Sequence, residues 1–554
     1  MKVLPDRKTA VFIKAYRTFL SADGKMDIDQ IIMLYRDMEP SLHKKASSAE
    51  IDIEAFMYSF LRLPQVMHEV NNVILAQTDD IFHREGYKTE FWTEAPAPAR
   101  RRKMYYNNEG TLAIFINSVT DLDDVVCLLT SFQIEWNKMH EALQSFKGKI
   151  SDKRKNDLQK TLGIDDANWE RMERIWAGRM YEWFFAIANE KPKKFQLRLL
   201  RGSYVDYKKA AQRWFENIIK HTRYKDISSR PLYFVSSNTH SLVNNITGWV
   251  VGLEKQLIEY LHEHRMARFL DYWRQIEKGE HPGSRENFLW YILKKYEKEN
   301  PKIREERHKF EHNLGIDFIE AKHYLDVDAQ VLSLKDIVSH GLADKLNIDA
   351  KSFASSEALI LNIDYPLGAG AYMVLSTVLQ NVNLVRGIYI LGKASFLHGN
   401  IGDIALPDCV YDTFSENTYI FKNSFTKKYF ERFTAGNILT NQKVVTSKGT
   451  FLHSLDMIQQ YFLHDYAILE MENGPYLNAI YEMVQYGRYP IGQTIDLVSS
   501  PIDIGIIHYA SDTPFTKAVT LGTRNLGYEG VESTYVSSYA ILKRIFEYEK
   551  RFAP

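Results

Sequence analysis

The chain has 554 residues, more than one hydrophobic core usually holds, so two or three domains are expected. Hydrophobic residues make up 45% and aromatic residues 13%, which excludes a chain that is disordered over most of its length. The 70 basic residues balance 70 acidic ones, so no net field favours nucleic acid or an anionic membrane. We therefore expect neither as a partner.

Cysteine usage and the first residues of the chain both favour the cytoplasm. Cys127 and Cys409 lie far apart, which suggests neither a disulfide framework nor a cysteine zinc site. The N-terminus lacks the apolar segment of a signal peptide, and no apolar run has the length needed to span a bilayer. A soluble cytoplasmic protein is the expectation.

Residues 1 to 225 are expected to form a mainly helical domain. Apolar residues recur there at steps of three and four, which is typical of a helix that turns one face to the core. The clearest such stripe consists of Trp169, Met172, Trp176, Met180 and Trp183. We interpret this stripe as core packing and not as a cofactor site.

A basic run follows a segment rich in alanine and proline at residues 95 to 99. It consists of Arg100, Arg101, Arg102 and Lys103. The pattern predicts an extended surface loop with solvated charges. A phosphate or nucleic-acid contact is the less favoured alternative.

Residues 226 to 330 are expected to be a helical linker region with one strand-turn-helix element. Pro231 to Val235 predict the strand, residues 236 to 241 the polar turn, and the helix begins near Leu242. Such a turn can offer free N–H groups to an anion. A helix capped by Ser or Thr is the simpler interpretation.

Charged helices are expected from about 250 to 315, and they contain a possible zinc motif. His308, Glu311 and His312 match the H-x-x-E-H pattern of zinc peptidases, with the glutamate as base. Only the generic candidates His323 and Asp326 offer a third ligand. Because a charged helix produces such matches by chance, a solvated face is favoured and no metal is expected.

From residue 331 to 554 the sequence pattern changes to short apolar runs that alternate with helical patterns. This order predicts an α/β domain with a largely parallel sheet covered on both faces. The predicted strands are 358–363, 387–391, 404–407, 442–446, 466–470 and 504–509, and the predicted helices are 371–379, 455–462 and 476–486. Glu472 and Asp512 each follow a predicted strand. Both side chains are therefore expected in one crevice at the ends of the strands, where open α/β sheets bind ligands.

Several motifs in this region resemble the nucleoside phosphorylase and nucleosidase superfamily. They are the strand, glycine turn and Gly-Asp strand at 387 to 407, Glu-Met-Glu at 470 to 472 and Ser-Asp at 511 to 512. The segments 444 to 447 and 511 to 522 are most similar to the AMP nucleosidases. Over residues 355 to 554 the resemblance implies a three-layer αβα domain that hydrolyses the N-glycosidic bond of a purine nucleotide or nucleoside. It also implies a homo-oligomer, dimer or hexamer, and no cofactor.

The resemblance also assigns roles to single residues. Glycosidic cleavage builds positive charge on the ribose and negative charge on the base, so the site needs an acid near the purine and anchors for the sugar. Glu472 would accept hydrogen bonds from the ribose hydroxyls, and Met471 would pack against the sugar. Asp512, its pKa raised by burial, would act at the purine N7. Ser511 would orient Asp512, and Arg524 would reach the base edge or a phosphate.

The chain departs from the family at two glycine turns. After Gly392 it has Lys393, Ala394, Ser395 and Phe396, where the family has a second glycine, so Phe396 is expected to reshape the base pocket. Lys393 either meets a 5′-phosphate or is solvated. The turn with Gly368 and Gly370 is expected to bind an anion through backbone N–H groups. Further candidate substrate-binding residues are Ser395 and Thr446.

The sequence alone leaves two questions open. Ile390 stands where phosphorylases carry an arginine for inorganic phosphate, which favours hydrolysis over phosphorolysis. The first strand of the fold and the group that activates water are expected within residues 231 to 241 or 329 to 335. A rival function is a regulatory protein that binds a nucleotide on this fold without turning it over, and a second rival is the zinc peptidase.

Overall fold

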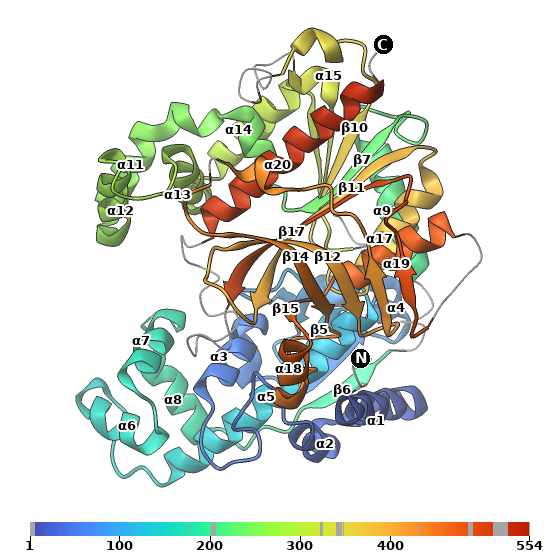
Figure 1. Cartoon of the computed structure of the whole chain (residues 1–554). Coiled ribbons are helices and arrows are strands. Elements are labelled where there is room, and N and C mark those ends of the chain that lie inside the picture. Colours follow the sequence, from blue (N-terminus) through green and yellow to red (C-terminus); the bar gives the residue numbers. More distant parts are fainter. Residues whose placement is uncertain are drawn as a thin grey trace.

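The computed structural model describes residues 6 to 552, except 177, 201–206, 322–324, 339–345, 347, 432, 486–490 and 513–529, and only the backbone of Asp23 and Asp512 (Figure 1). An N-terminal domain, blue to cyan in Figure 1, lies below a larger C-terminal domain, green to red. None of the described helices combines the length and the apolar character that a membrane crossing requires.

The N-terminal domain contains a six-stranded sheet in the order β1-β6-β2-β5-β4-β3. Its strands are β1 (Lys25–Asp27), β2 (Asn72–Ala76), β3 (Thr93–Glu94), β4 (Met104–Tyr106), β5 (Thr111–Phe115) and β6 (Gln196–Leu199). The central strand β2 is parallel to both β5 and β6. The sequence predicted a mainly helical domain and no strand here. Strands β1, β3 and β4 have only two or three residues, too few to show an alternation.

Eight helices of this domain surround the sheet within the described residues: α1 (Arg7–Asp23), α2 (Ile32–Asp37), α3 (Ile53–Arg62), α4 (Asp79–Arg84), α5 (Val119–Gln144), α6 (Lys155–Leu162), α7 (Asp166–Ile175) and α8 (Met180–Asn189). The predicted tryptophan stripe is buried as expected, from Trp169 to Trp183. It lies on two helices, since the chain turns at Gly178, whose φ is +79°.

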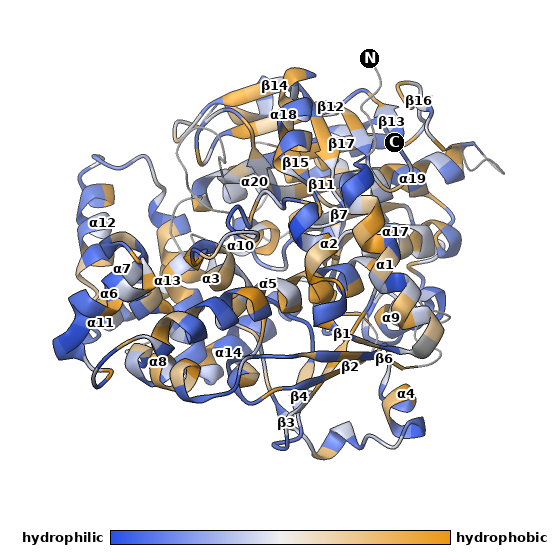
Figure 2. Cartoon of the chain, turned by 90° about the horizontal axis from the view of Figure 1, so that it is seen from below, coloured by the Kyte–Doolittle hydropathy of each residue, from blue (hydrophilic) through white to orange (hydrophobic). Residues whose placement is uncertain are grey.

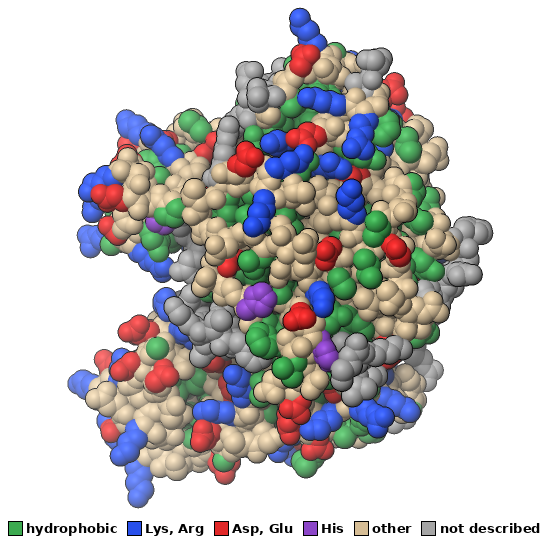
Figure 3. All heavy atoms as spheres, viewed as in Figure 1, with side chains coloured by type: hydrophobic (Ala, Val, Ile, Leu, Met, Phe, Trp, Pro, Cys, Tyr) green, Lys and Arg blue, Asp and Glu red, His purple; other side chains and the backbone are tan. Residues whose placement is uncertain are grey.

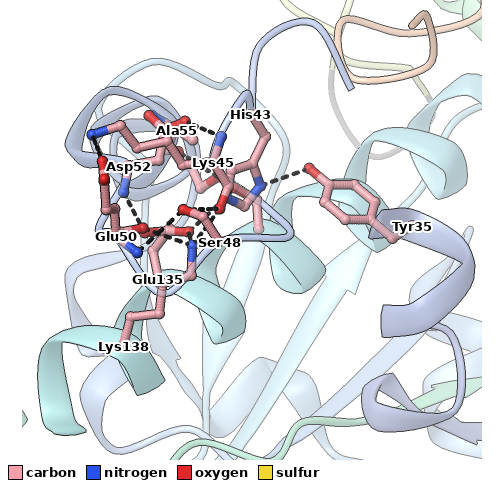
Figure 4. A network of polar contacts seen from close by, with 11 residues as sticks. Tyr35, His43, Lys45, Ser48, Glu50, Asp52, Ala55, Glu135 and Lys138 are labelled. Carbon is pink, nitrogen blue, oxygen red and sulfur yellow. Dashed lines mark hydrogen bonds and ion pairs between the residues drawn. The ribbon is translucent and has the colours of Figure 1, made fainter. Parts of the chain in front are cut away.

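A buried polar network attaches the segment from His43 to Asp52 to the long helix α5 (Figure 4). The imidazole of His43 lies 2.6 Å from a carboxylate oxygen of Glu135 and 3.1 Å from the hydroxyl of Tyr35. The other oxygen of Glu135 accepts a 2.6 Å bond from the N–H of Asp52, and Lys138 pairs with the same carboxylate. Because every charge in this network is paired, the network fixes the position of α5. This helix also reaches the C-terminal domain.

The C-terminal domain is built on an eleven-stranded sheet in the order β16-β13-β12-β14-β15-β11-β7-β10-β9-β8, with β17 paired to β11 and β12. The strands are β7 (Leu232–Ser237), β8 (Ile316–Ile319), β9 (Ala329–Ser333), β10 (Leu359–Asp364), β11 (Val385–Phe396), β12 (Ile404–Asp412), β13 (Asn417–Ile420), β14 (Ile438–Thr446), β15 (Tyr466–Glu470), β16 (Thr494–Asp496) and β17 (Asp503–Asp512). All six strands predicted from the apolar runs are present. The sheet is mixed and not largely parallel, since β15 runs antiparallel to β11 and β17 antiparallel to β12.

The strand expected in the linker region belongs to this sheet. β7 lies between β11 and β10 and is parallel to both. It is the first strand of the C-terminal sheet, and β9 from the second candidate segment pairs with β10. The sheet therefore begins about one hundred residues before the expected boundary at residue 331, because β7 is separated from the other strands by an insertion.

Helices cover both faces of the large sheet. On one face the core contains side chains of α9 (Tyr207–His221), α17 (Gly370–Asn381) and α19 (Asn473–Val484). On the other face it contains those of α10 (Ser241–Thr247), α15 (Leu334–Ile337) and α20 (Val531–Glu549). α18 (Leu455–Leu463) packs near β15 at the edge toward the N-terminal domain. In Figure 2 strand β12, which is buried along most of its length, is largely hydrophobic.

The insertion consists of the charged helices that the sequence predicted. They are α11 (Glu254–Glu263), α12 (Ala267–Glu277), α13 (Arg285–Glu299) and α14 (Pro301–Asn313). The insertion has a hydrophobic core of its own, which includes Tyr535 from α20. Figure 3 shows a recess in the molecular surface between this insertion and the helices α6 to α8 of the N-terminal domain.

The two domains share buried contacts. Phe451, in the loop after β14, belongs to the N-terminal core and lies 5.1 Å from the ring of Tyr58. The next residues of this loop continue the contact, since the carbonyl of His453 accepts a 3.0 Å bond from the N–H of Ser41. Asn117, just before α5, donates a 3.0 Å bond to Asp326 of the C-terminal domain.

Asp326→Asn is expected to stabilise the protein by ~1–2 kcal/mol relative to the parent near neutral pH and not in acid. Burial and the negative charge of Asp121 raise the pKa of Asp326 to about 6. The folded state therefore holds this proton more tightly than the unfolded chain, and the stability of the parent falls as pH rises from about 4 through about 6. Urea unfolding of both proteins across this range measures the difference. Asp271→Asn, at an exposed position of α12, is the control and should show no such trend.

Candidate functional site

Glu472 lies at the end of β15, where the strand passes into α19. One oxygen of its carboxylate accepts a 3.1 Å bond from the N–H of Gly368. The backbone of Met471 also hydrogen-bonds to this carboxylate, and the side chain is half-buried. Backbone N–H groups thus hold Glu472 in one orientation at the strand end.

The N-terminal domain contacts the turn that holds Glu472. Thr120, in the first turn of α5, accepts a 2.9 Å bond from the N–H of Ala369. Gly368 has a φ of +52°, and a Cβ there would lie 2.5 Å from the Thr120 side chain. Because the N–H groups of Gly368 and Ala369 already donate to protein oxygens, they do not form the anion site that the sequence predicted for this turn.

The backbone of Asp512 ends β17 and pairs with Ser395 of β11. On the other side of β11, Ser395 pairs with Leu469 of β15, three residues before Glu472. Since adjacent strands lie about 4.8 Å apart, the backbones of Leu469 and Asp512 are separated by about 10 Å. Because β17 is parallel to β11 and β15 is antiparallel to it, the chain leaves Leu469 toward Glu472 in the direction opposite to that in which β17 reaches Asp512. The side chain of Asp512 is outside the described residues, and so are all atoms of Arg524.

A buried second carboxylate, Glu470, supports this strand end. It accepts bonds from the N–H groups of Glu472 at 2.6 Å and Asn473 at 2.8 Å, and from the hydroxyl of Thr446. Thr446 in turn accepts a 2.8 Å bond from the N–H of Gly474. Thr446, predicted to contact substrate, is fully buried and acts on the backbone of this turn.

The two glutamates have raised pKa values. Burial raises the pKa of Glu470, and the negative charge of Glu472 raises it further. Burial also raises the pKa of Glu472, while the N–H of Gly368 and the positive charges of Arg100 and Lys393 oppose this change. A group of this kind gains or loses its charge closer to neutral pH than an exposed glutamate does.

Asn473 and His508 form a buried pair beside Gly392. The amide of Asn473 lies 2.6 Å from Nε2 of His508, and Nδ1 of His508 lies 3.3 Å from the carbonyl oxygen of Gly392. Burial lowers the pKa of His508 to about 4, so the imidazole is neutral. The sequence analysis missed both residues, although a histidine inside an apolar strand is a signal that could have drawn attention to His508.

Two buried polar atoms around these strand ends have no hydrogen-bond partner among the described residues. They are the hydroxyl of Ser395 and the amide oxygen of Asn473. Leaving such atoms unpaired costs about 1–3 kcal/mol each. Their presence is consistent with a polar ligand, since a ligand can pair them.

The predicted basic run does not form a solvated loop. Arg100 pairs with Asp124 at 2.9 Å, and the buried Arg102 pairs with Asp121 at 2.6 Å. Arg101 forms an ion pair across the domain interface with Asp364, at the end of β10. The acidic residues at the start of α5 thus organise the run, and such pairing over twenty residues leaves no local signal in the sequence.

The remaining predicted residues lie in different surroundings. Lys393 is exposed, Met471 is partly buried with its sulfur 3.8 Å from the Thr450 hydroxyl, and Gly370 is the first residue of α17. The hydroxyl of Ser511 donates a 3.2 Å bond to the carbonyl oxygen of Ala394. Phe396 is fully buried in the hydrophobic core.

The three residues of the possible zinc motif interact with other side chains. Glu311 is buried and pairs with Arg307 at 2.6 Å, and the ring of His308 lies 4.9 Å from that of Phe318. His312 lies 3.1 Å from Asp317. His323 is outside the described residues, and among those that the structure describes no group of three or more possible ligands can hold a metal ion.

Solved structures similar to this chain include three nucleosidases. AMP nucleosidase from Bacteroides thetaiotaomicron is 10% identical, with 55% of this chain and 89% of that chain covered and a TM-score of 0.28. The 5′-methylthioadenosine/S-adenosyl homocysteine nucleosidase from Campylobacter jejuni is 10% identical, with 42% and 90% covered and a TM-score of 0.29. S-adenosylhomocysteine nucleosidase from Streptococcus pyogenes is 14% identical, with 33% and 79% covered and a TM-score of 0.26. At these scores the similarity carries no argument about activity.

No curated protein matches the chain. A family model, described as a family of unknown function (DUF6909), matches residues 28 to 547. This match spans the N-terminal domain, the helical insertion and the large sheet, so they are parts of one family architecture. The chain belongs to this family of unknown function, DUF6909.

Proposed function

We propose that the chain hydrolyses the N-glycosidic bond of a purine nucleotide or nucleoside at the ends of β15 and β17. The observation that carries this proposal is that Leu469 of β15, three residues before Glu472, and Asp512, the last residue of β17, flank β11 on its two sides at Ser395. The spacing of adjacent strands puts the backbones of Leu469 and Asp512 about 10 Å apart. The motif resemblance described above supports the same reaction.

In this proposal the two carboxyl groups have different tasks. Glu472 accepts hydrogen bonds from the ribose hydroxyls with the oxygen that Gly368 does not use, and its charge stabilises the positive sugar in the transition state. Asp512 protonates the purine at N7 as the base departs. The unpaired atoms of Ser395 and Asn473 are candidates to bind the polar edges of the ligand.

Incubation with a panel of ligands tests the reaction class. The panel contains AMP, adenosine, inosine, methylthioadenosine and uridine, each with and without phosphate, and chromatography measures the free base. We expect base from at least one purine ligand, none from uridine, and no requirement for phosphate. If none of the purine ligands releases free base, the proposed activity is wrong.

Binding without turnover is the second candidate, because the N–H groups of Gly368 and Ala369 are already occupied and the segment after Gly392 differs from the family. Calorimetry with the same panel separates the two. Heat of binding together with intact ligand after incubation identifies a regulatory protein. Heat of binding together with released base identifies the enzyme.

A further inference from the structure

A pocket with a volume of about 650 Å³ lies between the two domains, on the surface of α1. Lys14, Arg17, Thr18 and Ser21 line it from α1, where residues three and four apart share one face of the helix. Lys448, from the loop after β14 of the C-terminal domain, completes the lining. The other lining residues are Ile13 and two alanines.

The charges in this pocket are unbalanced. Its lining contains three cations, Lys14, Arg17 and Lys448, and no carboxylate. Arg17 pairs at 2.6 Å with Asp123, which is completely buried beneath it. This pair accounts for one of the three positive charges, and the Nε–H of Arg17 is buried with no hydrogen-bond acceptor among the described residues.

Lys448 is the unusual member of this set. It is partly buried, and no hydrogen bond or ion pair joins its ammonium group to any residue that the structure describes. Asp412, an acidic group of its own domain, is buried and accepts bonds from the N–H groups of Phe414 and Ser415. Burial and the charge of Arg17 lower the pKa of Lys448, and the charges of Asp123, Asp412 and Glu416 oppose this change. A bound anion would offset the effects of burial and of Arg17.

We infer that this pocket binds a small phosphorylated metabolite, with Arg17 and Lys448 on the phosphate. Lys14 adds a third cation at the exposed rim, and Ser21 supplies a hydroxyl donor. The hydroxyl of Thr18 already donates a 2.7 Å bond to the carbonyl oxygen of Lys14. The apolar wall at Ile13 suits a ligand that is larger than free phosphate. A phosphate that accepts charge-assisted hydrogen bonds from two side chains is also bound more strongly than a phosphate that contacts a single solvated lysine.

The ligand would bridge the two domains next to the candidate catalytic turn. Lys448 follows Ser447, whose N–H donates a 2.7 Å bond to the carbonyl oxygen of Glu470. Two residues after Lys448, the hydroxyl of Thr450 contacts the sulfur of Met471. The site is distinct from Glu472, and the inference does not depend on the proposed hydrolysis.

Calorimetric titration of the full chain with inorganic pyrophosphate tests the inference. We expect saturable binding that Lys448→Gln weakens by about ten- to a hundredfold, the loss that follows from removing one charge-assisted hydrogen bond. Lys14→Gln, at an exposed position that cannot affect folding strongly, should weaken binding by a smaller factor. Binding should persist in Glu472→Gln, which places it outside the candidate catalytic site.

Lys8→Gln is the matched control, because Lys8 lies on the same helix, outside the pocket, and pairs with Glu39 at 3.5 Å. Its affinity for pyrophosphate should equal that of the parent. The inference is overturned if pyrophosphate does not bind the parent, or if Lys448→Gln and Lys14→Gln both bind it as tightly as Lys8→Gln does. Thermal unfolding of each variant checks that it is folded.

Discussion

Glu472→Gln is expected to reduce release of free base from a purine ligand by about two to three orders of magnitude. Glutamine keeps an acceptor for the N–H of Gly368, so the turn at the end of β15 stays in place. It lacks the negative charge that stabilises the positive sugar in the transition state. Single-turnover rates at saturating ligand measure the loss in the chemical step, separately from any loss in binding.

The matched control for this variant is Glu431→Gln, which removes the same charge at an exposed position after β13. Its rate should equal that of the parent. Asp512→Asn should also lose base release if its carboxyl group acts on the purine. Equal rates in the parent, Glu472→Gln and Asp512→Asn would remove both residues from the mechanism.

The pH dependence gives a further check on Glu472. Its ionised form is the one that acts in the proposed mechanism, and burial raises its pKa. The rate of the parent should therefore fall as pH drops through this raised pKa, at a higher pH than for an exposed glutamate. A rate that stays flat down to pH values near that of an exposed glutamate would contradict the role.

The strands of the C-terminal sheet could be predicted because each combines an apolar run with a turn signal. Tyr466–Glu470, for example, is buried along its whole length and ends at polar residues. The N-terminal sheet could not be predicted in this way, since strands such as Thr93–Glu94 are too short to carry a period. β7 was recognised as a strand but was assigned to the linker, because the insertion of α11 to α14 separates it in sequence from its neighbours.

The candidate site was predictable only where it depends on local sequence. Glu472 follows a clear strand, and its place at the strand end agrees with the expectation. The contact of Thr120 with Ala369 and the pair of Arg101 with Asp364 join residues about 250 positions apart. No local pattern encodes such contacts. The role of the N-terminal domain at this edge of the sheet therefore needed the structure.

The contacts between the two domains imply that they unfold together. Phe451 belongs to the C-terminal chain segment but is buried in the N-terminal core, with its ring near those of Tyr35 and Tyr58. Its loop also carries Ser447, which bonds to Glu470 at the candidate site. Removing this side chain should weaken both the domain interface and the turn that holds Glu472.

Phe451→Ala is expected to lower the free energy of unfolding by about 3–5 kcal/mol, the usual cost of deleting a buried phenyl ring. Only 2% of the Phe451 surface is exposed, so the cavity cannot be filled without movement of one domain against the other. Urea unfolding followed by tryptophan fluorescence measures the loss. Because this ring anchors a loop of the C-terminal domain in the N-terminal core, the variant should also unfold in two steps where the parent unfolds in one.

Phe462→Ala is the matched control, since this phenylalanine lies on α18, eleven residues further along, and is 48% exposed. Its loss should cost no more than about 1 kcal/mol and should leave a single transition. If Phe451→Ala behaves like this control, the domains are held together elsewhere. A large loss confined to Phe451→Ala would mean that the N-terminal domain is a structural part of the edge that carries Glu472, because the same loop is anchored in both.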